Sequence, residues 1–285
     1  MANKKASEEE KGVLEQFMIP FYHVSKRVPL FPGKNNTSSE AGLFGIEEEE
    51  LKSYREHFEQ NAKEAALEVL KDDEVVDSLD RLPLDGEETI VAFGDSITED
   101  AQGWFTILKH VLEISIEKAD FNFINAGVSY NTSSEALRRI DRDVLVNEPD
   151  WVIVALGTFD ALRLNIAPDR TLLPLSETWE NIETIQSVLE SRVDNPLIWI
   201  TPAPVITDML DENLLYDFTI QPRDLSQVQE LVAGKQGAIV DGQAKRMGDD
   251  KPQAWNYLPD GLHHSLSGHM ETVKAIIKKL AEPKN

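Results

Sequence analysis

Two short stretches of the sequence hold residue types suited to nucleophilic catalysis. Ser96 follows Gly94 and Asp95 directly after an apolar run, where a strand-to-helix turn can expose a hydroxyl and aim nearby backbone amides. Asp260 lies three residues before His263, close enough for one tight turn to bring the carboxylate onto the imidazole. A carboxylate on one ring nitrogen orients the other nitrogen as a general base toward a serine. Taken alone, each stretch also fits a plain structural role, since a serine at such a turn often caps a helix.

Two further loops carry glycine, polar and aromatic residues at comparable positions. One follows the second apolar run and contains Gly127, Tyr130 and Asn131, and the other follows the third run and contains Gly157 and Phe159. Ligands of open parallel sheets gather beyond the carboxyl ends of the strands, so these loops are where a binding site is expected. A glycine lets a backbone amide approach a substrate closely, although Gly127 equally fits a plain turn.

The elements that must position these loops alternate regularly after residue 88. Apolar runs of strand length lie at 89–95, 121–125, 151–156, 197–201 and 238–241. Candidate helices follow them at 103–117, 133–146, 178–193, 223–235 and 266–281. Nearly continuous apolar strands indicate burial on both faces, and strand-helix alternation requires right-handed crossovers. The pattern predicts the α/β class, as a three-layer α/β/α sandwich with a five-stranded parallel, flavodoxin-like sheet.

Residues 1–88 have a different character and are expected to form an N-terminal helical extension, with residues 89–285 as the α/β domain. The segment 35–39 is polar and loop-like, and four glutamates at 47–50 suit the first turn of a helix. Apolar residues then recur at spacings of three and four, at Leu51, Tyr54, Phe58, Ala62, Ala65 and Val69. The single apolar face of this helix either packs on the main domain, joins two copies in a homo-oligomer, or forms a lid.

The order of these blocks resembles that of the GDSL, or SGNH, hydrolase family over about residues 89–282. Gly94-Asp95-Ser96-Ile97 is similar to the family's nucleophile block, the stretch around Gly127 to its glycine block, and residues 157–160 to Gly-x-Asn-Asp. Residues 260–263 are similar to the final Asp-x-x-His block. The resemblance implies a nucleophilic Ser96, with His263 as general base and acid and Asp260 as its orienting partner. It also implies that the backbone amides of Ser96 and Gly127 hold the oxyanion.

One residue departs from the family pattern. The third oxyanion donor of the family is an asparagine, and Phe159 stands at that position with no polar hydrogen to offer. Removing one such donor typically costs about 100- to 1,000-fold in turnover. Asn131, Asn125 or Tyr130 in the neighbouring loop could replace it, or Phe159 could narrow the site for a small apolar acyl group. We therefore expect Phe159, Asn131 and Tyr130 to contact the substrate, with Tyr130 stiffening the loop or filling part of the pocket.

Cofactor chemistry has weak support in the sequence. His264 beside His263 suggests a metal site completed by Asp260 and His269, but adjacent histidines point apart on most backbones and no His-Glu-x-x-His pair occurs. A phosphate cradle after the first apolar run is disfavoured by the carboxylates around it and by the lack of a glycine-rich run. We expect no metal and no organic cofactor.

The composition excludes several classes of partner and chemistry. With 28 basic and 51 acidic residues the net charge is −23, which disfavours binding to nucleic acid or to anionic lipid. The absence of cysteine excludes disulfides, cysteine nucleophiles and thiolate zinc sites. Glutamates at 8–10 stand where a signal peptide needs an apolar stretch, so we expect a cytoplasmic location.

The function expected from the resemblance is hydrolysis of a small ester by an acyl-enzyme on Ser96, with short acyl groups such as acetyl. Two alternatives stay open at this point. A catalytically weakened binding protein would keep the pocket without the full oxyanion hole, and an acyltransferase would pass the acyl group to a sugar or another alcohol.

Overall fold

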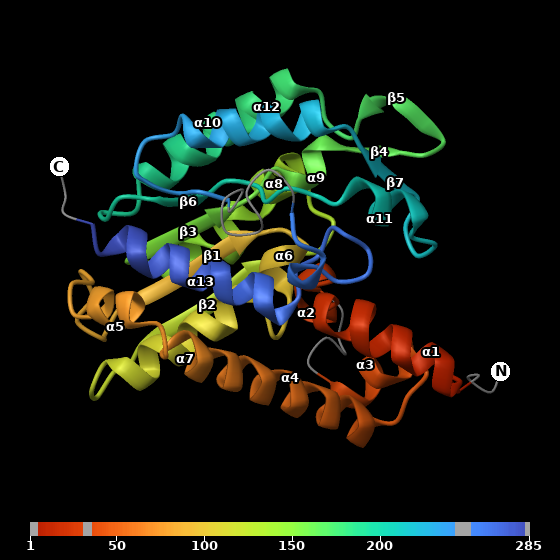
Figure 1. Ribbon diagram of the computed structural model, residues 1–285, viewed down its shortest axis with the longest axis horizontal. Coiled ribbons are helices and arrows are strands. Elements are labelled where there is room, and N and C mark those ends of the chain that lie inside the picture. The colour runs from red at the N-terminus through yellow and green to blue at the C-terminus, as the bar shows by residue number, and fades with distance from the viewer. Residues whose placement is uncertain (1–4, 31–35, 243–251, 283–285) are drawn as a thin grey trace.

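A five-stranded parallel sheet forms the centre of the protein (Figure 1). The structure is a computed structural model that describes residues 5–30, 36–242 and 252–282. The strand order is β2-β1-β3-β6-β8. The bounds are Thr89–Gly94 for β1, Asn122–Gly127 for β2, Trp151–Ala155 for β3, Ile198–Ile200 for β6 and Ala238–Val240 for β8. Each expected apolar run is one of these strands, and their order confirms the predicted flavodoxin-like sheet.

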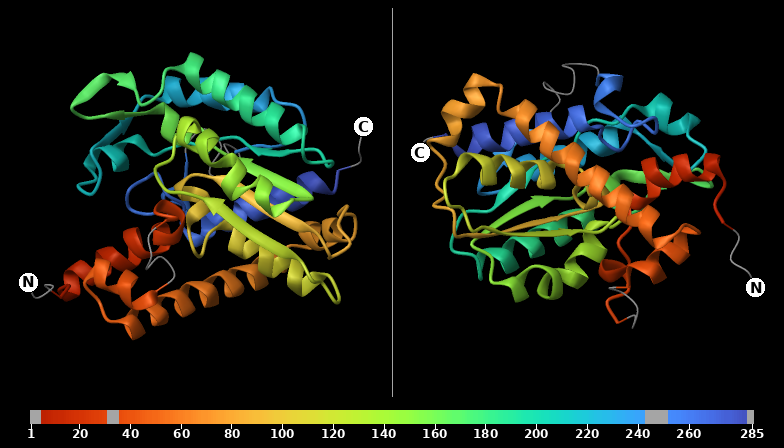
Figure 2. Two further views of the ribbon diagram at one scale, coloured as in Figure 1. Left: turned by 180° about the vertical axis from the view of Figure 1, so that it is seen from behind. Right: turned by 90° about the horizontal axis from the view of Figure 1, so that it is seen from below.

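Helices cover both faces of the sheet, as Figures 1 and 2 show. One layer contains α8 (Ser133–Asp143), α10 (Leu175–Glu190) and α12 (Pro222–Ala233). The other contains α7 (Trp104–Ser115) and α13 (Leu266–Leu280). Side chains alternate along β1, so that Val91 and Phe93 join the first core and Ile90 and Ala92 join the second. Both cores are buried, which explains the continuous apolar runs of the strands.

The register of the sheet brings three loops to one edge. Gly94 at the end of β1 is paired with Gly127 on β2 and with Ala155 on β3. The short helix α6 (Ser96–Glu99) follows β1, and α9 (Thr158–Ala161) follows β3 just beyond this edge. The loops that carry Ser96, Tyr130 and Phe159 therefore begin side by side.

A second, three-stranded antiparallel sheet stands beside the main one and was not expected. Its order is β5-β4-β7, with β4 at Leu162–Leu164, β5 at Ala167–Thr171 and β7 at Phe218–Ile220. The helix α11 (Thr207–Glu212) precedes β7. Figure 1 shows this sheet at the end of the molecule where α9 and α11 lie.

The N-terminal extension contains more helices than the one that was predicted. The expected helix is α4 (Glu48–Val69), and the others are α1 (Glu8–Val13), a π-helical turn η1 (Leu14–Met18), a 3-10 turn η2 (Ile19–Phe21), α2 (Val24–Arg27), α3 (Thr37–Phe44) and α5 (Asp73–Leu79). The expected loop at 35–39 is wrong from residue 37 onward, where α3 begins, and residue 35 lies outside the described residues. Asn36 caps α3 by accepting a hydrogen bond from the N–H of Ser39 at 2.9 Å.

The apolar face of α4 packs on the main domain, which is one of the three alternatives that the sequence left open. Ala62, Ala66 and Val69 join the core formed with α7 and α13, while Leu51 and Phe58 form a second cluster with the rest of the extension. Figure 2 shows α4 lying along α7. The division at residue 88 stays a prediction, although residues on both sides of it share one core.

Candidate active site

Ser96 is the first residue of α6, at the carboxyl end of β1. Its side chain is fully buried, and the preceding Asp95 caps the helix by accepting a hydrogen bond from the N–H of Ile97 at 3.0 Å. Burial raises the pKa of Asp95 to about 7. Gly94 is required because a Cβ at this position would lie 2.7 Å from the carbonyl oxygen of Ala155. The close approach of β1 and β3 thus fixes the start of α6.

Asp260 and His263 form a buried, directly bonded pair. Asp260 Oδ1 accepts hydrogen bonds from the N–H groups of Leu262 and His263, both at 3.0 Å. Its other oxygen, Oδ2, lies 2.6 Å from His263 Nδ1. The intervening Gly261 has φ of +66°, a conformation that favours glycine in such a turn. The three-residue spacing therefore brings the pair together, as predicted.

The charges of this pair stabilise each other. Burial disfavours the charged imidazolium, but Asp260, with smaller contributions from Asp100 and Asp95, outweighs it, so the pKa of His263 is raised. Burial likewise opposes the Asp260 carboxylate, but His263 and the two backbone N–H donors outweigh it, so the pKa of Asp260 is lowered. His263 Nε2, the atom that a general base would use, is buried and has no hydrogen-bond partner among the described residues.

Tyr130 supplies the backbone amide that contacts the serine. Its N–H donates a hydrogen bond to Ser96 Oγ at 2.9 Å. Tyr130 has φ of +64°, which is uncommon for a bulky residue and turns its amide out of the extended path of the chain. A residue in this conformation next to a nucleophile is a candidate oxyanion donor.

Gly127 is expected to supply an oxyanion donor, and that role stays a prediction. Its N–H is already used, because it donates to the side-chain oxygen of Asn125 at 2.9 Å. A Cβ on Gly127 would lie 2.7 Å from the carbonyl carbon of Thr98 and 2.9 Å from the Cα of Glu99. Gly127 is therefore needed so that the end of β2 can pack against the backbone of α6.

Asn131 and Asn125 are both held by the protein itself. Asn131 Oδ1 accepts from Arg139 Nε at 2.7 Å, and the same guanidinium donates to the carbonyl oxygens of Gly94 and Ala126. The side-chain amide of Asn125 donates to the carbonyl oxygen of Thr98 at 2.6 Å. These hydrogen bonds hold both side chains in place, and the role of the two asparagines as replacement donors stays a prediction.

Aromatic rings surround His263. Phe159 is fully buried, and its ring centroid lies 5.8 Å from that of Tyr130 and 6.4 Å from that of His263. The ring of Tyr216, just before β7, lies 5.9 Å from His263, and that of Phe21 lies 4.6 Å from it. The ring of Phe159 thus lies near both the imidazole of His263 and the ring of Tyr130, whose backbone N–H donates to Ser96 Oγ.

The residues considered for a metal do not meet at one point. Asp260 bonds to His263, whereas His269 Nε2 lies 3.1 Å from the carboxylate of Asp100. His264 is buried, and burial lowers its pKa well below the ordinary value. Within residues 5–30, 36–242 and 252–282, no group of three or more histidines and carboxylates is arranged to hold a metal ion.

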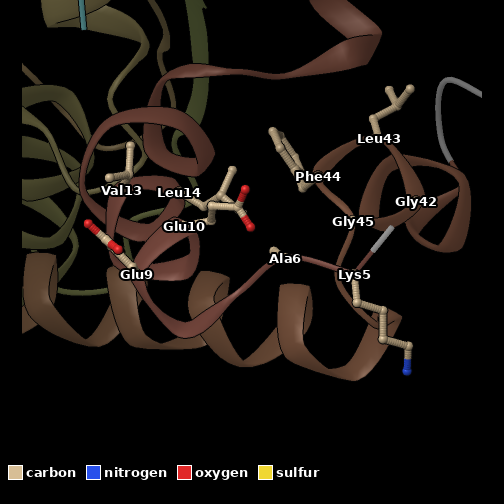
Figure 3. Close-up of a pocket in the computed structure, with 10 residues that line it drawn as sticks. All are labelled: Lys5, Ala6, Glu9, Glu10, Val13, Leu14, Gly42, Leu43, Phe44 and Gly45. Carbon is tan, nitrogen blue, oxygen red and sulfur yellow. The ribbon is translucent and has the colours of Figure 1, made fainter. Parts of the chain in front are cut away.

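A separate groove of about 580 Å³ lies between α1 and α3 (Figure 3). Glu10 and Phe44 lie across it from each other, with Leu14 beside them. No member of the proposed triad lines this groove.

The comparisons with known proteins identify the family. A model of the GDSL-like lipase/acylhydrolase family matches residues 92–270. The chain belongs to this family. The match includes Ser96, Tyr130, Phe159, Asp260 and His263, whereas Phe21 lies outside it.

Two solved structures share the fold. A lipase/acylhydrolase from Enterococcus faecalis is 23% identical, with a TM-score of 0.53 over 70% of this chain and 99% of that one. The acetylxylan esterase Axe2 from Geobacillus stearothermophilus is 20% identical, with a TM-score of 0.55 over 69% of this chain and 96% of that one.

Curated relatives match over shorter stretches. The uncharacterized lipoprotein YqeF of Bacillus subtilis is 35% identical over 86 residues, which is 27% of this chain and 33% of that protein. Esterase TesA of Pseudomonas aeruginosa is 31% identical over 81 residues, 27% of this chain and 39% of that protein. The match therefore spans between a third and two fifths of the curated relatives. Among the described residues of this GDSL-like protein, no helix has both the length and the apolar character needed to cross a bilayer.

Three residues at the site were missed by sequence reasoning. Phe21 lies in the extension, ahead of the part that the GDSL-like family model covers, and Tyr216 lies just before β7 of the unexpected second sheet. Glu99, buried in α6, accepts hydrogen bonds from the N–H of Ser129 and from His23. Glu99 stands three residues after the candidate nucleophile, and this placement on the nucleophile helix is the only signal in the sequence.

Proposed function

We propose that this protein is a serine-dependent hydrolase of carboxylic esters with short acyl groups. The observation that carries the proposal is the Asp260–His263 pair, whose free Nε2 lies in one cluster with a buried Ser96 that already receives a backbone N–H. A carboxylate-oriented imidazole next to an otherwise unreactive hydroxyl is the arrangement that activates serine. Membership of the GDSL-like lipase/acylhydrolase family supports the same chemistry.

The reaction follows from these groups in two halves. Ser96 Oγ attacks the ester carbonyl carbon while His263 Nε2 takes the hydroxyl proton, and the proton then passes to the leaving alcohol as the acyl–oxygen bond breaks. Water next gives a proton to Nε2 and attacks the acyl carbon, which releases the acid and restores Ser96. Asp260 holds the imidazole with its proton on Nδ1 throughout.

The oxyanion hole in this proposal uses backbone amides. The N–H of Tyr130 replaces the expected Gly127 donor, since it lies 2.9 Å from Ser96 Oγ whereas the N–H of Gly127 is bonded to Asn125. The amide of Ser96, at the N-terminus of α6, is the second donor. Phe159 offers no third donor, so we expect slower turnover than a site with all three.

The short acyl group follows from the crowding of the site. Ser96 and Phe159 are fully buried, and the rings of Phe159 and Tyr130 pack edge to face, so little space is left beside the serine. The name of the similar structure Axe2, an acetylxylan esterase, agrees with a two-carbon acyl group. The cytoplasmic location stays a prediction.

A labelling experiment tests the proposal. The wild type, Ser96→Ala and His263→Ala are treated with a fluorophosphonate probe, the modified peptide is identified by mass spectrometry, and hydrolysis of p-nitrophenyl acetate is measured on the same samples. Ser78→Ala is the matched control, because Ser78 is also buried but donates its hydroxyl to Glu74 in α5. Labelling at Ser96 that is lost in both site variants and kept in the control supports the proposal.

Phe159 favours one second candidate function, a binding protein that has kept the fold and lost turnover. A fully buried phenyl ring in place of a polar donor is the observation behind it. A folded wild type that takes no label and releases no p-nitrophenol would support this function over hydrolysis. Formation of a new ester when an alcohol is added would instead indicate acyl transfer.

A further inference from the structure

A segment of the N-terminal extension reaches the catalytic histidine. Residues 19–27 comprise η2 and α2, and Phe21 packs its ring 4.6 Å from the imidazole of His263. Phe21 is only 3% exposed. Figure 1 shows α2 next to α6 at the carboxyl edge of the sheet. Phe21 lies 75 positions before Ser96, so no feature of the motifs anticipates this contact.

The backbone on both sides of Phe21 is fixed by groups of the catalytic loops. The carbonyl oxygen of Pro20 accepts from the N–H of Ala101 at 2.9 Å, and that of Phe21 accepts from Ser129 Oγ at 2.6 Å. His23 bonds to Glu99 through its N–H at 3.2 Å and through Nδ1 at 3.0 Å. Glu99 belongs to the nucleophile helix, so the position of Phe21 is set relative to Ser96.

Two cations extend this attachment along the end of β2 and the loop that follows it. Lys26 Nζ donates to the side-chain oxygen of Asn125 at 3.1 Å and to the carbonyl oxygen of Gly127 at 3.0 Å. Burial lowers the pKa of Lys26 to about 8. Arg27 donates to the carbonyl oxygen of Ser129 at 2.9 Å. The segment is therefore bonded to the loop that carries Tyr130 as well as to α6.

We infer that Phe21 determines specificity by forming the wall that limits the length of the acyl group. An acyl group on Ser96 Oγ lies within reach of the His263 imidazole, because that imidazole must exchange protons at the same oxygen. The rings packed around His263 therefore bound the space that the acyl chain can enter. Phe159 and Tyr216 come from the main domain, whereas Phe21 is the wall that the extension adds. The inference rests on the proposed ester hydrolysis.

Acyl-chain selectivity tests this role. Values of kcat/KM for p-nitrophenyl acetate, butyrate and octanoate are measured for the wild type, Phe21→Ala and Phe58→Ala, each with its Ser96→Ala background subtracted. Phe58 is the matched control, since it is 2% exposed in α4 of the same extension and packs beside Tyr54. If Phe21→Ala does not fold, Phe21→Leu removes less of the ring and is expected to change the ratio in the same direction.

The expected result is a butyrate-to-acetate ratio that rises about 10-fold or more in Phe21→Ala and stays at the wild-type value in Phe58→Ala, because one methylene in a fitted pocket already changes selectivity by that factor. An unchanged ratio in Phe21→Ala, or an equal rise in both variants, overturns the inference and leaves ester hydrolysis standing. A wild type without Ser96-dependent turnover overturns the proposed function, and the inference with it.

Discussion

Replacement of Asp260 by asparagine tests whether activity depends on the tautomer of His263. The asparagine oxygen can keep accepting from the N–H groups of Leu262 and His263, which lie 3.0 Å from Oδ1, so the turn is retained. The side-chain NH₂ then stands where Oδ2 lies now, 2.6 Å from His263 Nδ1. Because an NH₂ group only donates there, Nδ1 must accept, and the ring proton moves to Nε2.

The size of the effect follows from that shift. A protonated Nε2 cannot take the proton of Ser96, so the base is lost while the fold and the oxyanion donors stay. In serine hydrolases the corresponding change lowers kcat about 10⁴-fold, which is about 5.5 kcal/mol of transition-state stabilisation. We expect Asp260→Asn to show a loss of that order with p-nitrophenyl acetate at pH 8.

Asp100→Asn is the matched control for this experiment. Asp100 also pairs with a buried histidine, His269, at 3.1 Å, but that pair lies outside the proposed triad. Its kcat at pH 8 should stay within about threefold of the wild type, with circular dichroism confirming that both variants are folded. A loss of less than 10-fold in a folded Asp260→Asn, or equal losses in both variants, would refute the assignment of Asp260 as the orienting group.

Three further outcomes follow from the same geometry. Since the pKa of His263 is raised, kcat/KM should increase with pH through a value above the ordinary 6.5, and a profile that is flat between pH 5 and 9 would contradict a histidine base. Gly127→Ala should lower the free energy of unfolding by about 1–3 kcal/mol in urea titrations, because its Cβ would meet the backbone of α6; an unchanged midpoint would contradict that packing. Burial raises the pKa of Asp95 from 3.8 to about 7, so its ionisation costs the folded state stability as pH rises through that interval. The free energy of unfolding of Asp95→Asn should therefore exceed that of the wild type by up to the order of 4 kcal/mol at pH 8. A difference in thermal midpoint between variant and wild type that is the same at pH 5 and pH 8 would count against this cause.

The regular part of the fold was predictable because burial on both faces leaves a clear pattern. All five strands of the main sheet and the five helices that follow them were found within a few residues of their ends. The second sheet was not, since β5 carries Asp169 and Arg170 without apolar alternation. The helix α1 had a readable signal in the capping box of Ser7 and Glu10, which sequence reasoning did not use.

The candidate site was predictable where local chain geometry decides the contact. The Asp260–His263 bond spans three residues, so spacing alone anticipates it. The choice between Gly127 and Tyr130 depends instead on which N–H is already bonded and on a positive φ, neither of which a residue type reveals. The contact between Phe21 and His263 depends on how the extension crosses the sheet edge, which is a matter of tertiary packing.

The packing of α4 against α13 can be completed only late in the synthesis of the chain. About 200 residues separate the end of α4 from the start of α13, and the two helices share one core with α7. Ribosomes add about 5–20 residues per second, so α4 waits roughly 10 to 40 seconds before its partner exists. During that interval the apolar stripe that ends at Val69 has only part of its cover. The apolar face of α4 therefore stays partly uncovered in the nascent chain until α13 has been made.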